Sequence, residues 1–367
     1  MSRQSLILPR LTSAIRTESR SLQLALVAAV VAALVGFIVF RAGGVPLFGD
    51  WSVGVVAAVV GGLTGTAGFV AAYLGALGPL PPRGSVRLRV ARRVLDTSAL
   101  ALNHTAIWLI VSLGGFSLLQ LGFAGLKLDT LTATTLLSVA VAVATYFMQA
   151  SGSSITAFRV SSLLSIFIVT GILASMITAP DHEWWKRNFS DLGTMEGFSG
   201  FAFNFTLIAT GSLVVTLADY VTADIRRWAL ARGSYDRVKV GVLGWSLVGL
   251  GLCLACVGIF PVDRFLALHN SVATGMVLIF VWLVLAIHRL VPGFPVTFFL
   301  LGYSFLVAIV VVTILFFPVG YYNLTALELV AAAAILGWVV ILIRTVAAHG
   351  QDVDDAVDAA EPRRALR

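Results

Sequence analysis

The chain has 367 residues, of which 59% are hydrophobic and only 12% are charged, and its formal net charge is +7. Soluble globular domains carry about 25% charged residues, so this composition excludes a soluble globular protein and indicates one embedded in a lipid bilayer. The excess of positive charge does not indicate nucleic-acid binding, because the basic residues lie in short loops between apolar runs, where membrane topology explains them.

Apolar runs recur along the whole chain, and each is long enough to cross a hydrocarbon core of about 30 Å. We predict an all-α integral membrane protein with about ten transmembrane helices and both termini in the cytoplasm. The predicted spans are residues 22–40, 51–77, 98–122, 130–148, 161–179, 201–221, 239–260, 268–288, 295–317 and 325–346.

The distribution of lysine and arginine sets the predicted orientation, since cytoplasmic loops of membrane proteins are enriched in both. With ten spans and a cytoplasmic N-terminus, 20 of the 25 basic residues lie inside, because the five outside are Arg41, Lys127, Lys186, Arg187 and Arg264. A miscounted span would exchange the sides of every later loop. We therefore predict a multi-pass protein of the cell (plasma) membrane with this topology.

The first segment, residues 1–21, is basic, and the apolar run after it lacks a clear small-residue cleavage site. We interpret that run as a retained helix, and residues 1–21 as either a short helix on the inner membrane surface or a frayed tail. Residues 22–148 form a predicted N-terminal block of four spans.

A stretch rich in serine and glycine, from Gln149 to Arg159, marks the predicted seam between this block and the next. Residues 158–348 are expected to form a bundle of six spans. The polar tail, residues 349–367, is expected to be a disordered cytoplasmic segment.

Glycines recur at short intervals in two of the spans. The second span contains Gly61, Gly65 and Gly68, and the seventh contains Gly241, Gly244, Gly249 and Gly251. Small residues let helix backbones approach closely, which is how spans pack when lipid provides no hydrophobic drive. We interpret both sets as packing positions.

Polar residues inside the spans are informative, because a charge at the bilayer centre costs about 2.5–3.5 kcal/mol on insertion scales. His104 lies inside the third span, and Asn204 lies just inside the sixth. His104 is either a proton or ligand site or a neutral histidine that hydrogen-bonds a neighbouring helix. Asn204 is expected to tie the preceding loop to the top of its helix.

The predicted external loop, residues 180–200, is rich in ionisable side chains, and the same face is expected to hold Asp263, His269 and Glu328. Carboxylates and imidazoles on one membrane face can bind a metal or act as acid and base. The chain contains neither an HxxxH nor an HExxH pattern. We therefore predict no catalytic residue, no metal site and no cofactor.

Two short motifs flank the middle of the chain. The first is Phe189-Ser190-Asp191-Leu192-Gly193 with Phe203-Asn204 after it, and the second is Gly258-Ile259-Phe260-Pro261-Val262-Asp263 followed by His269. Together they resemble the uncharacterised prokaryotic membrane family called domain of unknown function 998, over residues 158–348. That family is similar to the eukaryotic Frag1/DRAM/Sfk1 group of six-span proteins.

The resemblance implies a six-helix unit with a candidate site at its outer face and no established activity. The site residues that it implies are Ser190, Asp191, Gly193, Asn204, Asp263 and His269. Structural roles are also available to these motifs: Ser190 or Asp191 can cap a helix start, Gly193 permits a tight turn and Pro261 ends the seventh helix.

Three functions are consistent with these features. The first is a non-enzymatic protein that binds membrane lipids or other membrane proteins through its outer face and helix grooves. The second is a metal-assisted hydrolase of an envelope lipid, and the third is a ten-span secondary transporter that uses His104 and Asn204. We predict the first and leave enzymatic activity undecided; the residues of the hydrolase hypothesis are His182, His269, Asp191 and Asp263.

Overall fold

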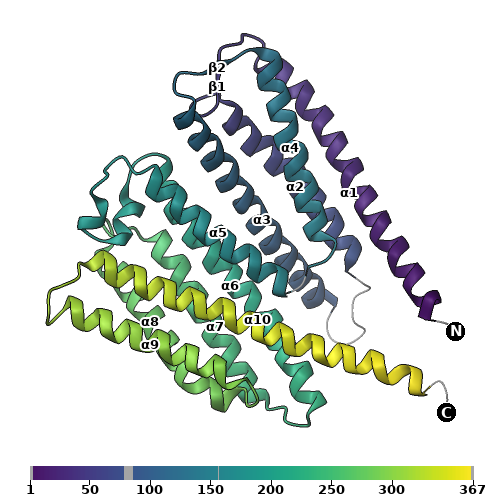
Figure 1. The fold of residues 1–367 in the computed structure, drawn as a ribbon, viewed down its shortest axis with the longest axis vertical. Coiled ribbons are helices and arrows are strands. Elements are labelled where there is room, and N and C mark those ends of the chain that lie inside the picture. Colours follow the sequence, from purple (N-terminus) through teal and green to yellow (C-terminus); the bar gives the residue numbers. More distant parts are fainter. Residues whose placement is uncertain (1–2, 78–85, 156, 365–367) are drawn as a thin grey trace. The chain divides into compact units, whose positions relative to one another are not determined.

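The computed structural model describes residues 3–77, 86–155 and 157–364, and these contain ten α-helices, two short 3-10 helices and two short strands (Figure 1). All ten α-helices are long and apolar enough to cross a membrane. Helices are the expected form there, because they satisfy every backbone hydrogen bond internally where no water is present. The prediction of an all-α membrane protein with ten spans is confirmed.

The chain divides into two compact units, Met1–Ile155 and Thr156–Arg367. The boundary lies within the stretch from Gln149 to Arg159 that the sequence singles out. The membrane side on which the termini lie stays a prediction.

Four helices and a short β-ribbon form the first unit. Helix α4 packs against α1 and α2, and α3 packs mainly against α2. The two strands pair antiparallel and join the loop after α1 to the loop before α4. The elements are α1 (Arg3–Val39), β1 (Val45–Pro46), α2 (Val53–Ala76), α3 (Val86–Gly122), β2 (Lys127–Leu128) and α4 (Thr130–Gly152).

Glycine brings α2 close to its neighbours in this unit. A Cβ atom at Gly61 would lie 2.6 Å from Nε1 of Trp108 on α3, and one at Gly65 would collide with Sδ of Met148 on α4. The indole N–H of Trp108 donates a hydrogen bond to the carbonyl of Ala57 on α2 at 3.0 Å. The predicted packing role of these two glycines is confirmed.

The second unit contains six α-helices, as the resemblance implies. Helix α6 packs against α5, α7 and α10, while α10 also packs against α5 and α9, and α8 packs against α7 and α9. The elements are α5 (Ala157–Ile177), η1 (Trp184–Lys186), η2 (Phe189–Thr194), α6 (Phe198–Ala231), α7 (Arg237–Ile259), α8 (Leu266–Leu290), α9 (Val296–Phe316) and α10 (Leu324–Arg364).

Both terminal segments are helical where the structure describes them. Helix α1 is continuous from Arg3, so no separate surface helix precedes the first span. Helix α10 continues to Arg364, through most of the predicted disordered tail. A helix extends at low cost once it exists, because the unfavourable nucleation step is not repeated. Residues 1–2 and 365–367 lie outside the described part of the chain.

Candidate functional site

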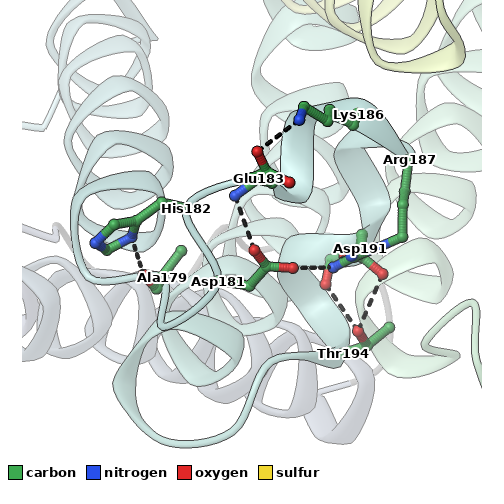
Figure 2. A network of polar contacts seen from close by, with 8 residues as sticks. All are labelled: Ala179, Asp181, His182, Glu183, Lys186, Arg187, Asp191 and Thr194. Carbon is green, nitrogen blue, oxygen red and sulfur yellow. Dashed lines mark hydrogen bonds and ion pairs between the residues drawn. The ribbon is translucent and has the colours of Figure 1, made fainter.

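The loop between α5 and α6 is held together by a charge network around Arg187 (Figure 2). Its guanidinium donates to Oδ2 of Asp191 through Nε at 2.8 Å and to Oδ2 of Asp181 through Nη2 at 2.7 Å. The N–H of Glu183 and, after it, Arg187 hold the pKa of Asp181 below its ordinary value. This stabilisation is therefore present above the ordinary aspartate pKa and is lost as the pH falls through the lowered value.

The apolar residues of the same loop are anchored in the helix bundle. Phe189 and Leu192 are buried in a cluster with Phe203, Leu207 and other residues of the second unit. The rings of Phe189 and Phe203 pack edge to face, with centroids 5.1 Å apart. The Phe-Ser-Asp-Leu-Gly motif thus places Phe189 and Leu192 in the core, while Ser190 and Asp191 between them make polar contacts.

Glu328, near the start of α10, holds the start of η2. Its carboxylate accepts hydrogen bonds from the backbone N–H groups of Phe189 and Ser190 and, at 3.2 Å, from the hydroxyl of Ser190. The prediction that Ser190 or Asp191 caps this helix is wrong. The N-cap residue of η2 is Asn188, and its side chain makes no capping hydrogen bond. The acceptor for the N–H of Phe189 is instead the carboxylate of Glu328, 139 residues away in sequence.

A second contact from the same end of α10 holds η1. The side chains of Asn323 and Thr325 both donate to the carbonyl of Trp185, at 2.6 and 2.8 Å. The start of α10 therefore fixes both 3-10 helices of the loop.

Gly193 and Asn204 form the contact between the end of η2 and α6. Nδ2 of Asn204 donates to the carbonyl of Gly193 at 2.7 Å, so Asn204 makes the connection that the sequence leads us to expect. A Cβ atom at Gly193 would lie 2.5 Å from Oδ1 of Asn204 and 3.0 Å from Cδ1 of Phe203. Glycine is required here by this close approach; the described positive-φ glycines do not include Gly193, so the predicted turn role is wrong.

Because of this contact, we expect Gly193→Ala to cost about 1–3 kcal/mol of unfolding free energy, the usual range for overpacking. Asn204→Ala alone should cost about 1 kcal/mol, the net value of one hydrogen bond. The double variant should be more stable than the sum of the single effects predicts, because Oδ1 is no longer in the way. Unfolding of the purified protein in detergent measures all three, and additive effects would contradict the described contact.

His269 joins the turn after α7 to the start of α8. It is 3% exposed, and its Nδ1 lies 2.7 Å from the carbonyl oxygen of Phe260. A carbonyl can only accept, so Nδ1 carries the proton. His269 also interacts electrostatically with the carboxylate of Glu328. Helix α7 ends at Ile259, and Pro261 comes directly after the C-cap residue Phe260, as the sequence predicts.

The predicted site residues thus fall into separate groups. Ser190 and His269 lie around Glu328, while Gly193 and Asn204 contact each other. Asp191 turns to Arg187, and Asp263 is exposed and pairs with its neighbour Arg264 at 3.7 Å. Glu328 is the central residue; the sequence places it on the same face, but it is not among the predicted site residues. Its position in the sequence indicates a structural role, because a lone carboxylate near the end of an otherwise apolar span must find hydrogen-bond partners.

An apolar groove of about 640 Å³ lies next to this cluster in the second unit. Helices α5, α6 and α10 supply most of its wall, and Phe189 of η2 lines it as well. Thr210 on α6 is another lining residue, and its fully buried hydroxyl has no hydrogen-bond partner among the described residues. The backbone N–H of Phe189 is bound by Glu328, so the polar cluster positions one wall of the groove.

The family comparison covers this region. A family model described as "Protein of unknown function (DUF998)" matches residues 160–345, slightly more than half of the chain. The chain belongs to the DUF998 family. No curated protein and no solved structure matches it. The DUF998 match includes the whole cluster around Glu328 and every residue that lines the groove, while the similarity to the Frag1/DRAM/Sfk1 group stays a prediction.

His104 lies outside the DUF998 match, in the first unit. Its Nδ1 lies 2.8 Å from the carbonyl of Leu100, and its Nε2 lies 2.9 Å from the hydroxyl of Ser151. Because the carbonyl must accept, Nδ1 carries the proton and Nε2 accepts from Ser151. The ring also packs on Phe69, with centroids 4.2 Å apart. These contacts support the interpretation of His104 as a neutral histidine that joins neighbouring helices.

Metal-ligating side chains do not gather in the described part of this DUF998 protein. Within residues 3–77, 86–155 and 157–364, no three His, Cys, Asp or Glu side chains form a group that could hold a metal ion. His182, one residue of the hydrolase hypothesis, has its Nδ1 3.2 Å from the carbonyl of Ala179 (Figure 2).

Proposed function

We propose that this DUF998 protein is a non-enzymatic lipid-binding protein that holds one tail of a membrane lipid in the groove between α5, α6 and α10. The observation that carries the proposal is the groove itself. Its volume of about 640 Å³ lies within the range of about 300–1,000 Å³ that is usual for ligand sites. Its walls are spans of a membrane protein, so lipid tails are the molecules that surround it.

Affinity in such a groove has to come from packing. A lipid tail gains little hydrophobic free energy on leaving the bilayer for a protein groove, because both are apolar. Shape and single polar contacts therefore decide which lipid binds.

The contacts of Ser190 and His269 support a structural role for both. The hydroxyl of Ser190 donates to the carboxylate of Glu328, which also accepts from the backbone N–H groups of Phe189 and Ser190 and thereby holds the start of η2. The proton-bearing nitrogen of His269 is directed at the carbonyl of Phe260.

We further propose that the protein lies in the plasma membrane with both termini in the cytoplasm. The support is the distribution of lysine and arginine, because the proposed orientation leaves only five of the 25 basic residues outside. Under this orientation the loop with η1 and η2 faces the exterior.

The groove can be tested by native mass spectrometry of the full chain released from a mild detergent. We expect the unaltered protein to retain a stoichiometric lipid, and Ala333→Phe to lose most of it, because Ala333 lines the groove and a phenyl ring would occupy the space of the tail. Ala267→Phe is the matched control, since Ala267 lies on the exposed side of α8. Equal retention by both variants would refute the groove as the binding site.

An activity assay separates the non-enzymatic proposal from the hydrolase alternative. The purified protein is incubated with its retained lipids, and the lipids are analysed by mass spectrometry over time. We expect no turnover. Turnover that disappears in His269→Ala, with thermal unfolding unchanged, would replace the proposed function by an enzymatic one.

A further inference from the structure

A second groove lies between α7 and α8, and the lipid-binding groove shares none of its lining residues. Its volume is about 850 Å³, and it is lined by residues of α7 and α8 alone. Its lining includes Arg237, Gly241 and Trp245 of α7 and Trp282 of α8. The two helices belong to one compact unit, so the groove is defined within that unit.

One end of the groove is basic. Arg237 is the first residue of α7 and lines the groove, and Lys239 is exposed two residues further along the helix. Helices α7 and α8 are consecutive and joined by a short turn, so the end of α8 lies at the same membrane face as the start of α7. There α8 places exposed His288 and Arg289.

The rest of the groove is apolar and open. Trp245 is 78% exposed and Trp282 is 43% exposed, so both side chains are accessible from the groove. Between the basic end and Trp245 lies Gly241, where an added Cβ atom would meet nothing within 4 Å. Glycine therefore leaves a notch on α7 between an arginine and an indole.

We propose that this groove binds a phospholipid with an anionic headgroup. The headgroup phosphate lies at Arg237, whose guanidinium can bind two phosphate oxygens at once. The acyl chain lies along the notch at Gly241 and between the indoles of Trp245 and Trp282. Arg289 adds positive charge around the headgroup, whereas Lys239 is paired with Asp236 at 4.0 Å. The remaining positive charge favours a lipid of net negative charge over a zwitterionic one.

The indoles provide the readout. Phosphatidylglycerol with brominated acyl chains, added to the full-length protein in detergent micelles, is expected to quench the fluorescence of Trp245 and Trp282. Brominated phosphatidylcholine at the same concentration should quench less. Replacing both indoles by phenylalanine should remove the difference between the two lipids, which assigns the quenching to this groove among the eight tryptophans of the chain.

Two pairs of variants test the geometry. Arg237→Ala should weaken phosphatidylglycerol binding about fivefold, the effect of one basic residue at an anionic lipid surface, whereas Lys239→Ala removes the same charge from a residue outside the groove lining and should have a smaller effect. Gly241→Leu should abolish binding by filling the notch. Gly115→Leu is its control, because Gly115 on α3 is equally free of neighbours.

Equal quenching by both lipids, equal effects of Arg237→Ala and Lys239→Ala, or unchanged binding in Gly241→Leu would each overturn the proposal. Inorganic phosphate that competes fully with the lipid would show that the site recognises a free anion, and would overturn it as well. Ala333→Phe, which closes the other groove, should leave this quenching unchanged, so failure of one proposal is distinguishable from failure of the other.

Discussion

Replacing Gly211 by alanine is expected to be among the most damaging single changes in the second unit. A Cβ atom at this position would collide with the carbonyl oxygen of Gly251 and lie 2.5 Å from the backbone nitrogen of Ala255. Both atoms belong to the backbone of α7, so no side-chain rotation relieves the contact, and the two helices have to move apart. Overpacking of this kind costs about 1–3 kcal/mol and sometimes more. Thermal unfolding in detergent measures the loss.

Gly241→Ala is the matched control for this prediction. Gly241 lies on α7 with no atom within 4 Å of an added Cβ, so its predicted packing role is wrong. Alanine there gains helix propensity of about 1 kcal/mol without a clash. We expect a small rise in the unfolding temperature. If Gly211→Ala behaves like Gly241→Ala, the close approach of α6 and α7 is contradicted.

Glu328→Ala should release the loop between α5 and α6 from the helix bundle. The change leaves the N–H groups of Phe189 and Ser190 without their acceptor, and an unsatisfied buried donor costs about 1–3 kcal/mol. We expect a lower unfolding temperature and fast hydrogen exchange at these two amides. Because Phe189 also lines the apolar groove, the retained lipid should decrease as well.

Two further variants define the role of the carboxylate. Glu328→Gln keeps an oxygen acceptor but not the charge, so its effect should be intermediate. Glu183→Ala removes a carboxylate of the same loop that is exposed and pairs with Lys186, and surface pairs contribute about 0–1 kcal/mol. Amides of Phe189 and Ser190 that stay protected in Glu328→Ala would show that the carboxylate does not hold the loop.

The sequence also predicts parts of the candidate site. It places Phe189 to Gly193 in a loop before an apolar helix, and it identifies Asn204 as the residue that ties this loop to α6, because an amide just inside a span needs a nearby partner. The sequence predicts a tight turn at Gly193, whereas the structure requires glycine there because Asn204 lies too close for a side chain. Either cause would select glycine, so the residue type alone does not distinguish them. Only the tertiary structure shows that the side chain of Asn204 contacts Gly193.

By itself, the sequence determined the membrane character of this protein and the number of its spans. Bilayer thickness sets a minimum length of about 20 apolar residues for a span, and the need to satisfy backbone hydrogen bonds makes each span a helix, so ten apolar runs are sufficient for ten helices. These are local properties, and a window of about 20 residues contains them.

The tertiary structure alone decided which residues meet. Glu328 binds Phe189 across 139 residues, and Gly211 faces Gly251 of the next helix. Both grooves likewise arise between helices. In lipid the hydrophobic effect does not select helix partners, so selection depends on close packing and on single hydrogen bonds. Such contacts depend on the shapes of two surfaces together, which is why no single stretch of the sequence contains them.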